Sequence, residues 1–401
     1  MKEVDKIFDS FLKESVFRNK FMLQTNYIPE SIQHREKEIT QLASIIAPAL
    51  RMEKISNLFL YGKTGSGKTL SILYLRDQLL KKAKQQNTNL RIEYINCKLK
   101  KVADTEYRIL AELIRKLGGN IPATGLPTES VYNKFINILE AKKQVFILIL
   151  DEVDYIVKKI SDSFLYNLTR LNSELNKAQI SIIGISNDLI FLDNLDPRVK
   201  SSLGEEEIVF SPYNAVQLQD ILKERSKKAF KQGVVAEGVI EKCAAYAARE
   251  HGDARRALDL LRIAGEIAER DEEKRIILEH IDKANEKMEK DKILDIVETE
   301  PKQFQLTLLA IIQLIESKKL DKIFTGDVYE HYQNLCKQIS FETLTQRRVG
   351  DIIAEFDMLG IINARVVSKG RYGRMREIKL AVNQNIINKI KDILYESLNL
   401  K

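Results

Sequence analysis

Short apolar runs alternate with longer amphipathic stretches between Asn57 and Pro212. Runs of this length and composition are typical of buried strands, and the stretches between them have the spacing of helices. Strands that alternate with helices predict a parallel sheet covered on both faces. We therefore expect an α/β domain over residues 26–212. The predicted strands are residues 58–61, 91–96, 145–150, 180–186 and 207–210.

The strand pattern stops after Pro212, and residues 213–298 have the helical periodicity of a small lid domain. Pro301 and its neighbours break helix structure and mark a boundary near residue 299. Three predicted helices followed by a basic hairpin are typical of a winged helix, which we expect over residues 299–401. Its elements are helices 303–317, 325–338 and 343–359 and strands 361–367 and 377–382.

Residues 1–25 precede the α/β domain and mix charged residues with large apolar ones. This mixture predicts a short amphipathic arm that docks onto another surface. The large apolar residues are Phe8, Phe11, Leu12, Phe17 and Phe21.

Composition narrows the class of protein. A chain of 401 residues with 44% hydrophobic and 30% charged residues contains enough apolar material for two or three folded domains. The net charge of +7 allows a polyanionic partner but does not establish one. The three cysteines lack paired or His-linked spacing, which argues against a disulfide framework or a zinc site. With no signal-peptide pattern and no apolar run near the roughly 20 residues that span a bilayer, we expect a soluble cytoplasmic protein without a membrane partner.

Residues 62–69 match the P-loop pattern G-x-x-x-x-G-K-[ST] between a predicted strand and a predicted helix. The glycines permit a loop whose amides converge on phosphate oxygens, and the following helix N-terminus favours negative charge. Lys68 is expected to reach the β- and γ-phosphates, and the Thr69 hydroxyl to bind Mg²⁺. The predicted phosphate-binding residues are Gly62, Thr64, Gly65, Ser66, Gly67, Lys68 and Thr69.

The strand at 145–150 ends in Asp151 and Glu152. Since this strand follows the P-loop in the same α/β region, Asp151 is expected at the carboxyl end of the sheet, where it can hold Mg²⁺. Glu152 suits the orientation and deprotonation of an attacking water molecule. An apolar run ending in Asp-Glu alone would indicate only a strand and a solvated turn.

Three further polar residues could complete a hydrolytic site. Asn187 ends a predicted strand and is expected near Asp151, although Asn is also a common turn residue. Arg198 is a candidate arginine finger toward the nucleotide of a neighbouring protomer, or else an ordinary surface arginine. Arg255 opens a lid helix, where a basic residue opposes the helix dipole and indicates an anionic partner, and Arg256 competes for this role.

These motifs, in this order, resemble an AAA+ ATPase. With the winged helix that carries residues 345–348 and 370–374, the chain closely resembles the archaeal origin-recognition complex subunit 1 / cell division control protein 6 family of replication initiators. The resemblance extends from Tyr27 and the segment 34–36 to about Asn385. It implies a nucleoid-associated, ATP- or ADP-switched protein that binds double-stranded origin DNA and helps to recruit the replicative helicase, together with paralogous initiators. Members often hold ADP tightly and hydrolyse ATP slowly, which implies a weak ATPase that acts as a switch.

The resemblance also implies roles for individual residues. Lys68, Thr69, Asp151 and Glu152 become the Walker residues, Asn187 sensor 1, Arg255 sensor 2, and Arg198 the finger between protomers. The segment 27–35 would lie against the adenine, with Ile28, Pro29 and Arg35 as candidate contacts. The helix expected near 104–117, in an insertion near 98–118, would touch DNA through Lys100 and Arg108.

The residues themselves also favour DNA. Hydroxyl, amide and guanidinium groups near the start of the third predicted helix suit phosphate and base-edge contacts in a major groove. The hairpin concentrates basic residues, which suit a phosphate backbone or a minor groove. The candidate DNA contacts are Thr345, Gln346, Arg347 and Arg348 on the helix and Lys369, Arg371, Tyr372 and Arg374 on the hairpin.

Two other functions share this domain plan. One is an ATP-dependent transcription regulator, which binds a promoter instead of an origin. The other is a clamp-loader-like ATPase whose winged helix binds only protein. The basic hairpin argues against the latter.

Overall fold

A computed structural model describes residues 15–98, 105–122, 124–203, 206–318, 323–368, 374–382 and 384–400. The chain divides into two compact units, residues 1–281 and 282–401. Each unit is described below by itself, and helix α12 (Leu278–Thr299) contains the division.

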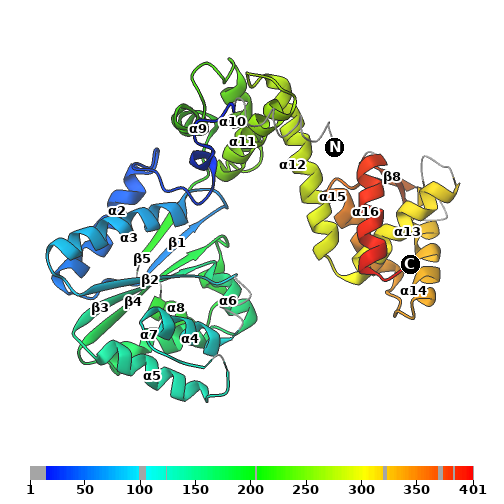
Figure 1. The fold of residues 1–401 in the computed structure, drawn as a ribbon. Coiled ribbons are helices and arrows are strands. Elements are labelled where there is room, and N and C mark those ends of the chain that lie inside the picture. Colours follow the sequence, from blue (N-terminus) through cyan, green and yellow to red (C-terminus); the bar gives the residue numbers. More distant parts are fainter. Residues whose placement is uncertain are drawn as a thin grey trace, which may run out of the picture. The chain divides into compact units, whose positions relative to one another are not determined.

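A five-stranded parallel sheet forms the centre of the first unit (Figure 1). Its strands lie in the order β2-β3-β4-β1-β5, so every pair of neighbours requires a crossover. All five strands predicted from the sequence are confirmed, with shifts of one or two residues at their ends. The strands are β1 (Leu58–Gly62), β2 (Leu90–Asn96), β3 (Gln144–Asp151), β4 (Ala178–Ser186) and β5 (Glu206–Phe210).

Helices cover both faces of this sheet (Figure 1), as the alternation of elements predicted. Strand β3 is buried along its whole length, and its successive side chains point to opposite faces of the sheet. Val145, Ile147 and Ile149 pack on one face, while Phe146 and Leu148 pack on the other. One face carries α2 (Glu36–Ile46), η2 (Ala47–Arg51) and α3 (Lys68–Gln85). The other carries α4 (Glu106–Lys116), α5 (Thr128–Glu140), α6 (Val153–Lys159), α7 (Ser163–Arg170), η3 (Leu171–Ser173), η4 (Phe191–Asn194) and α8 (Pro197–Leu203).

The lid is helical, as predicted. Asn214 starts α9 with a capping box, in which its side chain accepts from the Gln217 amide and the Gln217 side chain accepts in return. The short helix η1 (Lys20–Leu23) packs on α9 and α11, so the described part of the predicted arm docks onto the lid. The lid helices are α9 (Ala215–Ala229), α10 (Val239–Arg249), α11 (Ala254–Arg270) and the start of α12.

The second unit is a winged helix with its own apolar core. The three predicted helices are present, together with a three-stranded antiparallel sheet in the order β6-β8-β7. Sequence analysis did not predict the two-residue strand β6 or the last helix, α16, which packs on α13. The elements are α13 (Lys302–Lys318), β6 (Ile323–Phe324), α14 (Thr325–Gln338), α15 (Gln346–Met358), β7 (Ile362–Ser368), β8 (Arg374–Leu380) and α16 (Gln384–Ser397).

Two winged-helix predictions need correction. The second hairpin strand was expected at residues 377–382, but β8 runs from Arg374 to Leu380. The third helix was expected to begin at residue 343, but α15 begins at Gln346. Thr345 is the N-cap, because its backbone is extended and its hydroxyl accepts a hydrogen bond from the Arg348 amide. The threonine therefore ends the preceding loop and is not part of the helix.

All three cysteines are free and buried. Within the described ranges, none of the helices is both long enough and apolar enough to cross a bilayer. The domain limits expected from the sequence stay predictions.

Candidate functional site

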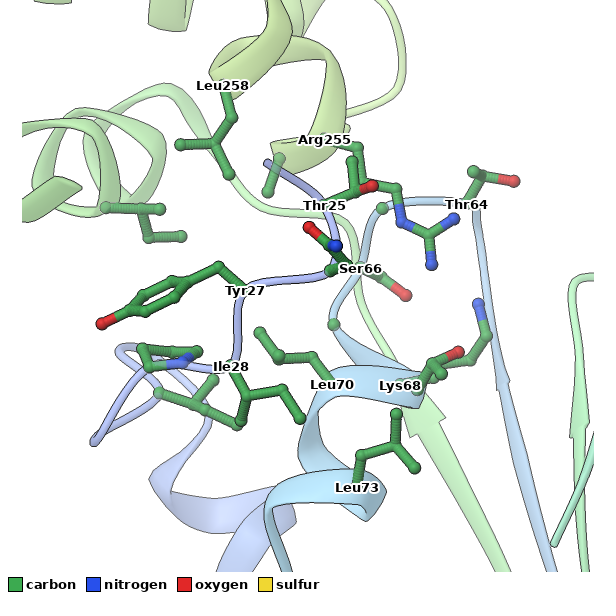
Figure 2. A pocket seen from close by; sticks show the side chains of 18 of the residues that line it. Thr25, Tyr27, Ile28, Thr64, Ser66, Lys68, Leu70, Leu73, Arg255 and Leu258 are labelled. Atoms are coloured by element: carbon green, nitrogen blue, oxygen red, sulfur yellow. The ribbon is translucent and has the colours of Figure 1, made fainter. Parts of the chain in front are cut away.

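A cavity of about 420 Å³ lies between the P-loop, the segment 24–33 and the lid (Figure 2). Figure 2 shows two different ends. Thr64, Lys68 and Arg255 gather at one end, while Tyr27 and Leu258 face the other. The first end therefore combines loop amides with two cations and suits phosphate, whereas the second is aromatic and aliphatic and suits a flat base.

Lys68 is the first residue of α3 and is buried. Its Nζ donates to the carbonyl oxygens of Gly62 and Lys63 at 2.7 and 2.9 Å, and to Oδ1 of Asn187 at 2.9 Å. Burial, opposed by the negative charge of Asp151 and assisted by the positive charge of Arg255, lowers the pKa of the Lys68 ammonium to about 8. The oxygens that accept from this ammonium are neutral. Phosphate oxygens bound in the cavity would provide negative charge beside it.

Asp151 ends strand β3 and collects hydrogen bonds from three donors. The Thr69 hydroxyl donates to its Oδ2 at 2.9 Å, the Tyr94 phenol donates to the same oxygen at 2.8 Å, and the Glu152 amide donates to Oδ1 at 3.0 Å. Glu152 also lines the cavity and has a left-handed backbone, with φ of 54°. Sequence analysis did not single out Tyr94, although its place two residues before the end of a neighbouring parallel strand was a usable signal.

The lid is joined directly to the P-loop. The Ala254 amide, at the start of α11, donates to the carbonyl oxygen of Gly65 at 3.3 Å. Asp253 caps the same helix and lies so close that a Cβ at position 65 would be 1.8 Å from its Oδ1. Gly65 also has a positive φ of 72°, so only glycine suits this contact. The next residue, Arg255, lines the cavity, whereas Arg256 pairs with Glu250 at 2.7 Å.

Arg35 is placed differently from the expectation. It does not line the cavity and is buried behind the P-loop, so we correct its assignment from adenine contact to positioning. Its guanidinium donates to the carbonyl oxygens of Ser66 and Ser211, pairs with Glu38 at 2.8 Å, and lies 4.0 Å from the ring centroid of Tyr213. Arg35 therefore ties the P-loop to the segment that enters the lid.

The other predicted nucleotide residues divide in the same way. Gly62 does not line the cavity, and its carbonyl oxygen accepts from Lys68 instead. The predicted residues that line it are Ile28, Pro29, Thr64, Gly65, Ser66, Gly67, Lys68, Thr69, Asp151, Glu152, Asn187 and Arg255.

Arg198 lies away from the cavity, on α8, and its side chain is 77% exposed. Its guanidinium donates two hydrogen bonds to the Asp196 carboxylate, at 3.0 and 3.1 Å. Within its own protomer it cannot serve the cavity. An exposed position is what a residue that acts on the nucleotide of a neighbouring protomer requires.

The candidate DNA surface lies on α15 and the β7–β8 hairpin. Gln346, Arg347 and Arg348 are exposed at the start of α15. Arg376 lies on strand β8 of the hairpin, and its Nη1 donates to the Gly350 carbonyl oxygen, which ties the hairpin to α15. In the first unit, Arg108 is exposed on α4. Lys100, Lys369, Arg371 and Tyr372 lie outside the described residues, as does the side chain of Arg374.

Comparisons with known proteins agree with this architecture. Three family models match: the AAA domain at residues 52–189, the Cdc6 AAA+ ATPase-type lid domain at 219–286, and the CDC6 C-terminal winged helix domain at 295–390. The ORC1-type DNA replication protein of Thermococcus onnurineus is 50% identical over 384 residues, which cover 94% of this chain and 92% of that protein. The chain belongs to the family of ORC1-type DNA replication proteins.

Two further relatives support the family assignment. ORC1-type DNA replication protein 1 of Methanosarcina acetivorans is 48% identical over 400 residues, covering 99% of this chain and 95% of that protein. The solved structure of the Aeropyrum pernix ORC1 protein in complex with DNA matches with a TM-score of 0.80 and 42% identity, over 96% of this chain and 98% of that chain. The fold of this ORC1-type chain is therefore the predicted AAA+ domain with a lid and a winged helix.

Proposed function

We propose that this protein initiates DNA replication as a nucleotide-dependent switch that binds double-stranded origin DNA. The observation that carries the proposal is the cavity in which Lys68, Asp151, Asn187 and Arg255 meet, in a chain that ends in a winged helix. The membership in the ORC1-type family supports it, as does the likeness to an ORC1 protein in complex with DNA.

ATP or ADP is the ligand that the cavity suits best. Lys68, Arg255 and the amides of the P-loop would hold the phosphates, because two cations and a helix N-terminus face one end. Tyr27, Ile28 and Pro29 would lie against the adenine at the apolar end.

Thr69 and Asp151 would hold Mg²⁺. Their side-chain oxygens lie 2.9 Å apart, and a hydroxyl with a carboxylate is a donor set that Mg²⁺ prefers, with phosphate and water as its other ligands. When bound, the metal would neutralise phosphate charge.

Hydrolysis would change the state of the switch. Glu152 lines the cavity beside Asp151 and is the candidate base for water, and Asn187 is the candidate residue to orient it. Arg198 would act on the nucleotide of a neighbouring protomer. Because the finger would come from a neighbouring protomer, we propose that the chain by itself is a weak ATPase.

The winged helix would bind the duplex through the exposed side chains of α15 and through the basic hairpin. Lys100 and Arg108 of the AAA+ domain would add contacts to the phosphate backbone. Recruitment of the replicative helicase, and assembly with paralogous initiators, follow from the family resemblance.

A titration of the full chain into labelled duplexes tests the proposal. One duplex carries candidate origin repeats and the other a scrambled sequence, at two salt concentrations and with ADP or ATP. We expect tight binding that prefers the origin duplex and weakens steeply with salt. Equal, weak binding to both duplexes would contradict the DNA function and would indicate a protein-binding winged helix.

A further inference from the structure

Residues 15–27, which we call the strap, are joined to the lid by backbone pairing. Phe17 forms an antiparallel bridge with Phe230. The amides of Arg18 and Asn19 donate to the Ala229 carbonyl oxygen at 2.8 and 3.0 Å, and the Lys231 amide donates to the carbonyl oxygen of Val16 at 3.1 Å. Backbone pairing fixes the register between two segments. The strap therefore has one defined position on the lid.

Phe17 occupies a socket on the lid and is 9% exposed. Its ring stacks on Phe230, with centroids 4.8 Å apart. Gly265 of α11 also lines the socket. A Cβ at this position would lie 2.6 Å from Cζ of Phe17 and 2.9 Å from the Phe230 ring. The socket therefore exists only because position 265 lacks a side chain.

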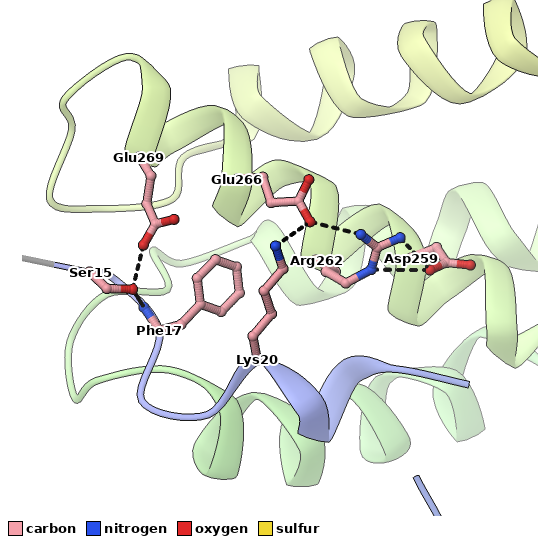
Figure 3. Close-up of polar contacts among 7 residues, drawn as sticks. All are labelled: Ser15, Phe17, Lys20, Asp259, Arg262, Glu266 and Glu269. Carbon is pink, nitrogen blue, oxygen red and sulfur yellow. Dashed lines mark hydrogen bonds and ion pairs between the residues drawn. The ribbon is translucent and has the colours of Figure 1, made fainter. Parts of the chain in front are cut away.

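Polar contacts hold the strap along α11 (Figure 3). Lys20 Nζ lies 2.7 Å from Oε1 of Glu266, and the same oxygen lies 2.7 Å from Nη1 of Arg262. One turn further along, Glu269 accepts from the Ser15 hydroxyl and from the Val16 amide. The helix that carries Arg255 into the cavity thus carries the strap on its later turns.

The strap continues directly into the wall of the nucleotide cavity. Its residues from Gln24 to Tyr27 line the cavity, and Tyr27 lies at the apolar end. Arg225 of α9 joins the two parts, because its Nη1 donates to the Met22 carbonyl oxygen at 3.2 Å and its Cζ lies 4.4 Å from the Tyr27 ring centroid. Arg225 is itself 6% exposed and lines the cavity. The base-side wall therefore depends on the docking of the strap.

We propose that the strap, anchored by Phe17, holds the lid and the base-side wall together, and that Phe17 is a positioning residue for nucleotide binding. The inference rests on the proposed nucleotide function and adds a role for the strap in nucleotide binding. Phe17 does not line the cavity and acts through the wall that Tyr27 forms. Release of the strap loosens the base and ribose, while the phosphates keep their contacts with the P-loop.

The test compares two probes on the full chain: ADP with a fluorescent N-methylanthraniloyl group on the ribose, and inorganic pyrophosphate. Phe17→Ala removes the anchor. Gly265→Ala fills the socket with a methyl group and favours the helix, but the methyl group also meets Phe230 of the lid, so circular dichroism checks that the lid of this variant stays helical. Phe341→Ala is the matched control, because it removes a partly exposed phenylalanine in the second unit.

We expect both strap variants to release the labelled ADP about tenfold faster, with pyrophosphate affinity within about twofold of wild type. Unchanged ADP release in either variant, or equal weakening of both probes, would overturn the inference. A wild-type chain that does not bind labelled ADP, or a Lys68→Ala variant that binds it normally, would instead overturn the nucleotide function itself, and the inference with it.

Discussion

The phenol of Tyr94 donates a hydrogen bond to Oδ2 of Asp151 at 2.8 Å. Burial, and then the negative charge of Asp151, raise the pKa of Tyr94, so the phenol remains a donor throughout the physiological range. The Thr69 hydroxyl donates to the same oxygen from the other side of the site. Tyr94 therefore fixes the orientation of a carboxylate that would hold Mg²⁺.

We expect Tyr94→Phe to weaken the Mg²⁺-dependent part of nucleotide binding about tenfold, because partners that orient a metal ligand have effects of this size. Titration of Mg²⁺ into the ADP complex measures the change. ADP binding in the presence of a chelator serves as the control and should stay within about twofold of wild type. An equal loss with and without Mg²⁺ would show that the variant damages the cavity as a whole.

Nucleotide binding should take up protons near pH 8. Burial lowers the pKa of Lys68 to about 8, so roughly half of the free molecules carry a neutral amine at that pH. Bound phosphates raise this pKa and favour the ammonium, so affinity falls as pH rises above 8 and is constant well below it. Calorimetry in two buffers of different ionisation enthalpy should give an uptake of about half a proton at pH 8 and almost none at pH 6.5. Identical proton uptake in Lys68→Met would assign the effect to another group.

Arg35→Ala should lower the free energy of unfolding of the first unit by about 3 kcal/mol, because Glu38 and two carbonyl oxygens lose a buried partner. Arg35→Lys should recover only part of the loss, since an ammonium cannot reproduce the planar fork of a guanidinium. The control is Arg51→Ala, whose exposed pair with Glu53 should contribute little to the free energy of unfolding. Denaturant unfolding measures all three variants, and similar small losses for Arg35→Ala and Arg51→Ala would disprove the positioning role.

Arg347→Ala combined with Arg348→Ala should weaken binding to the origin duplex and reduce the salt dependence of affinity by about two phosphate contacts. Nucleotide binding should not change. Lys337→Ala with Lys389→Ala removes the same charge from exposed positions on α14 and α16 and serves as the matched control. Fluorescence anisotropy across a salt series gives both quantities, and equal effects of the two pairs would mean that α15 has no special role.

Much of the site was predictable because its residues occur in short motifs. The P-loop places Lys68 and Thr69 at a helix start, and the ends of parallel strands bring Asp151 and Asn187 to one edge of the sheet. These positions follow from the backbone geometry of the P-loop and from the parallel direction of neighbouring strands. Both restrict where the motif residues can lie. The start of α15 was placed three residues too early because a threonine suits both a first helical turn and an N-cap.

The sequence by itself thus determined the α/β domain, its five strands, the helical lid, the winged helix and the motifs of the nucleotide cavity. Only the tertiary structure decided the strand order and the position of Arg35 behind the P-loop. It also decided the contact of Tyr94 with Asp151 and the docking of Phe17 against Gly265. Each of these relations joins residues far apart in the chain. Hydrophobic pattern states which side chains are buried, but their partners depend on how whole elements pack together.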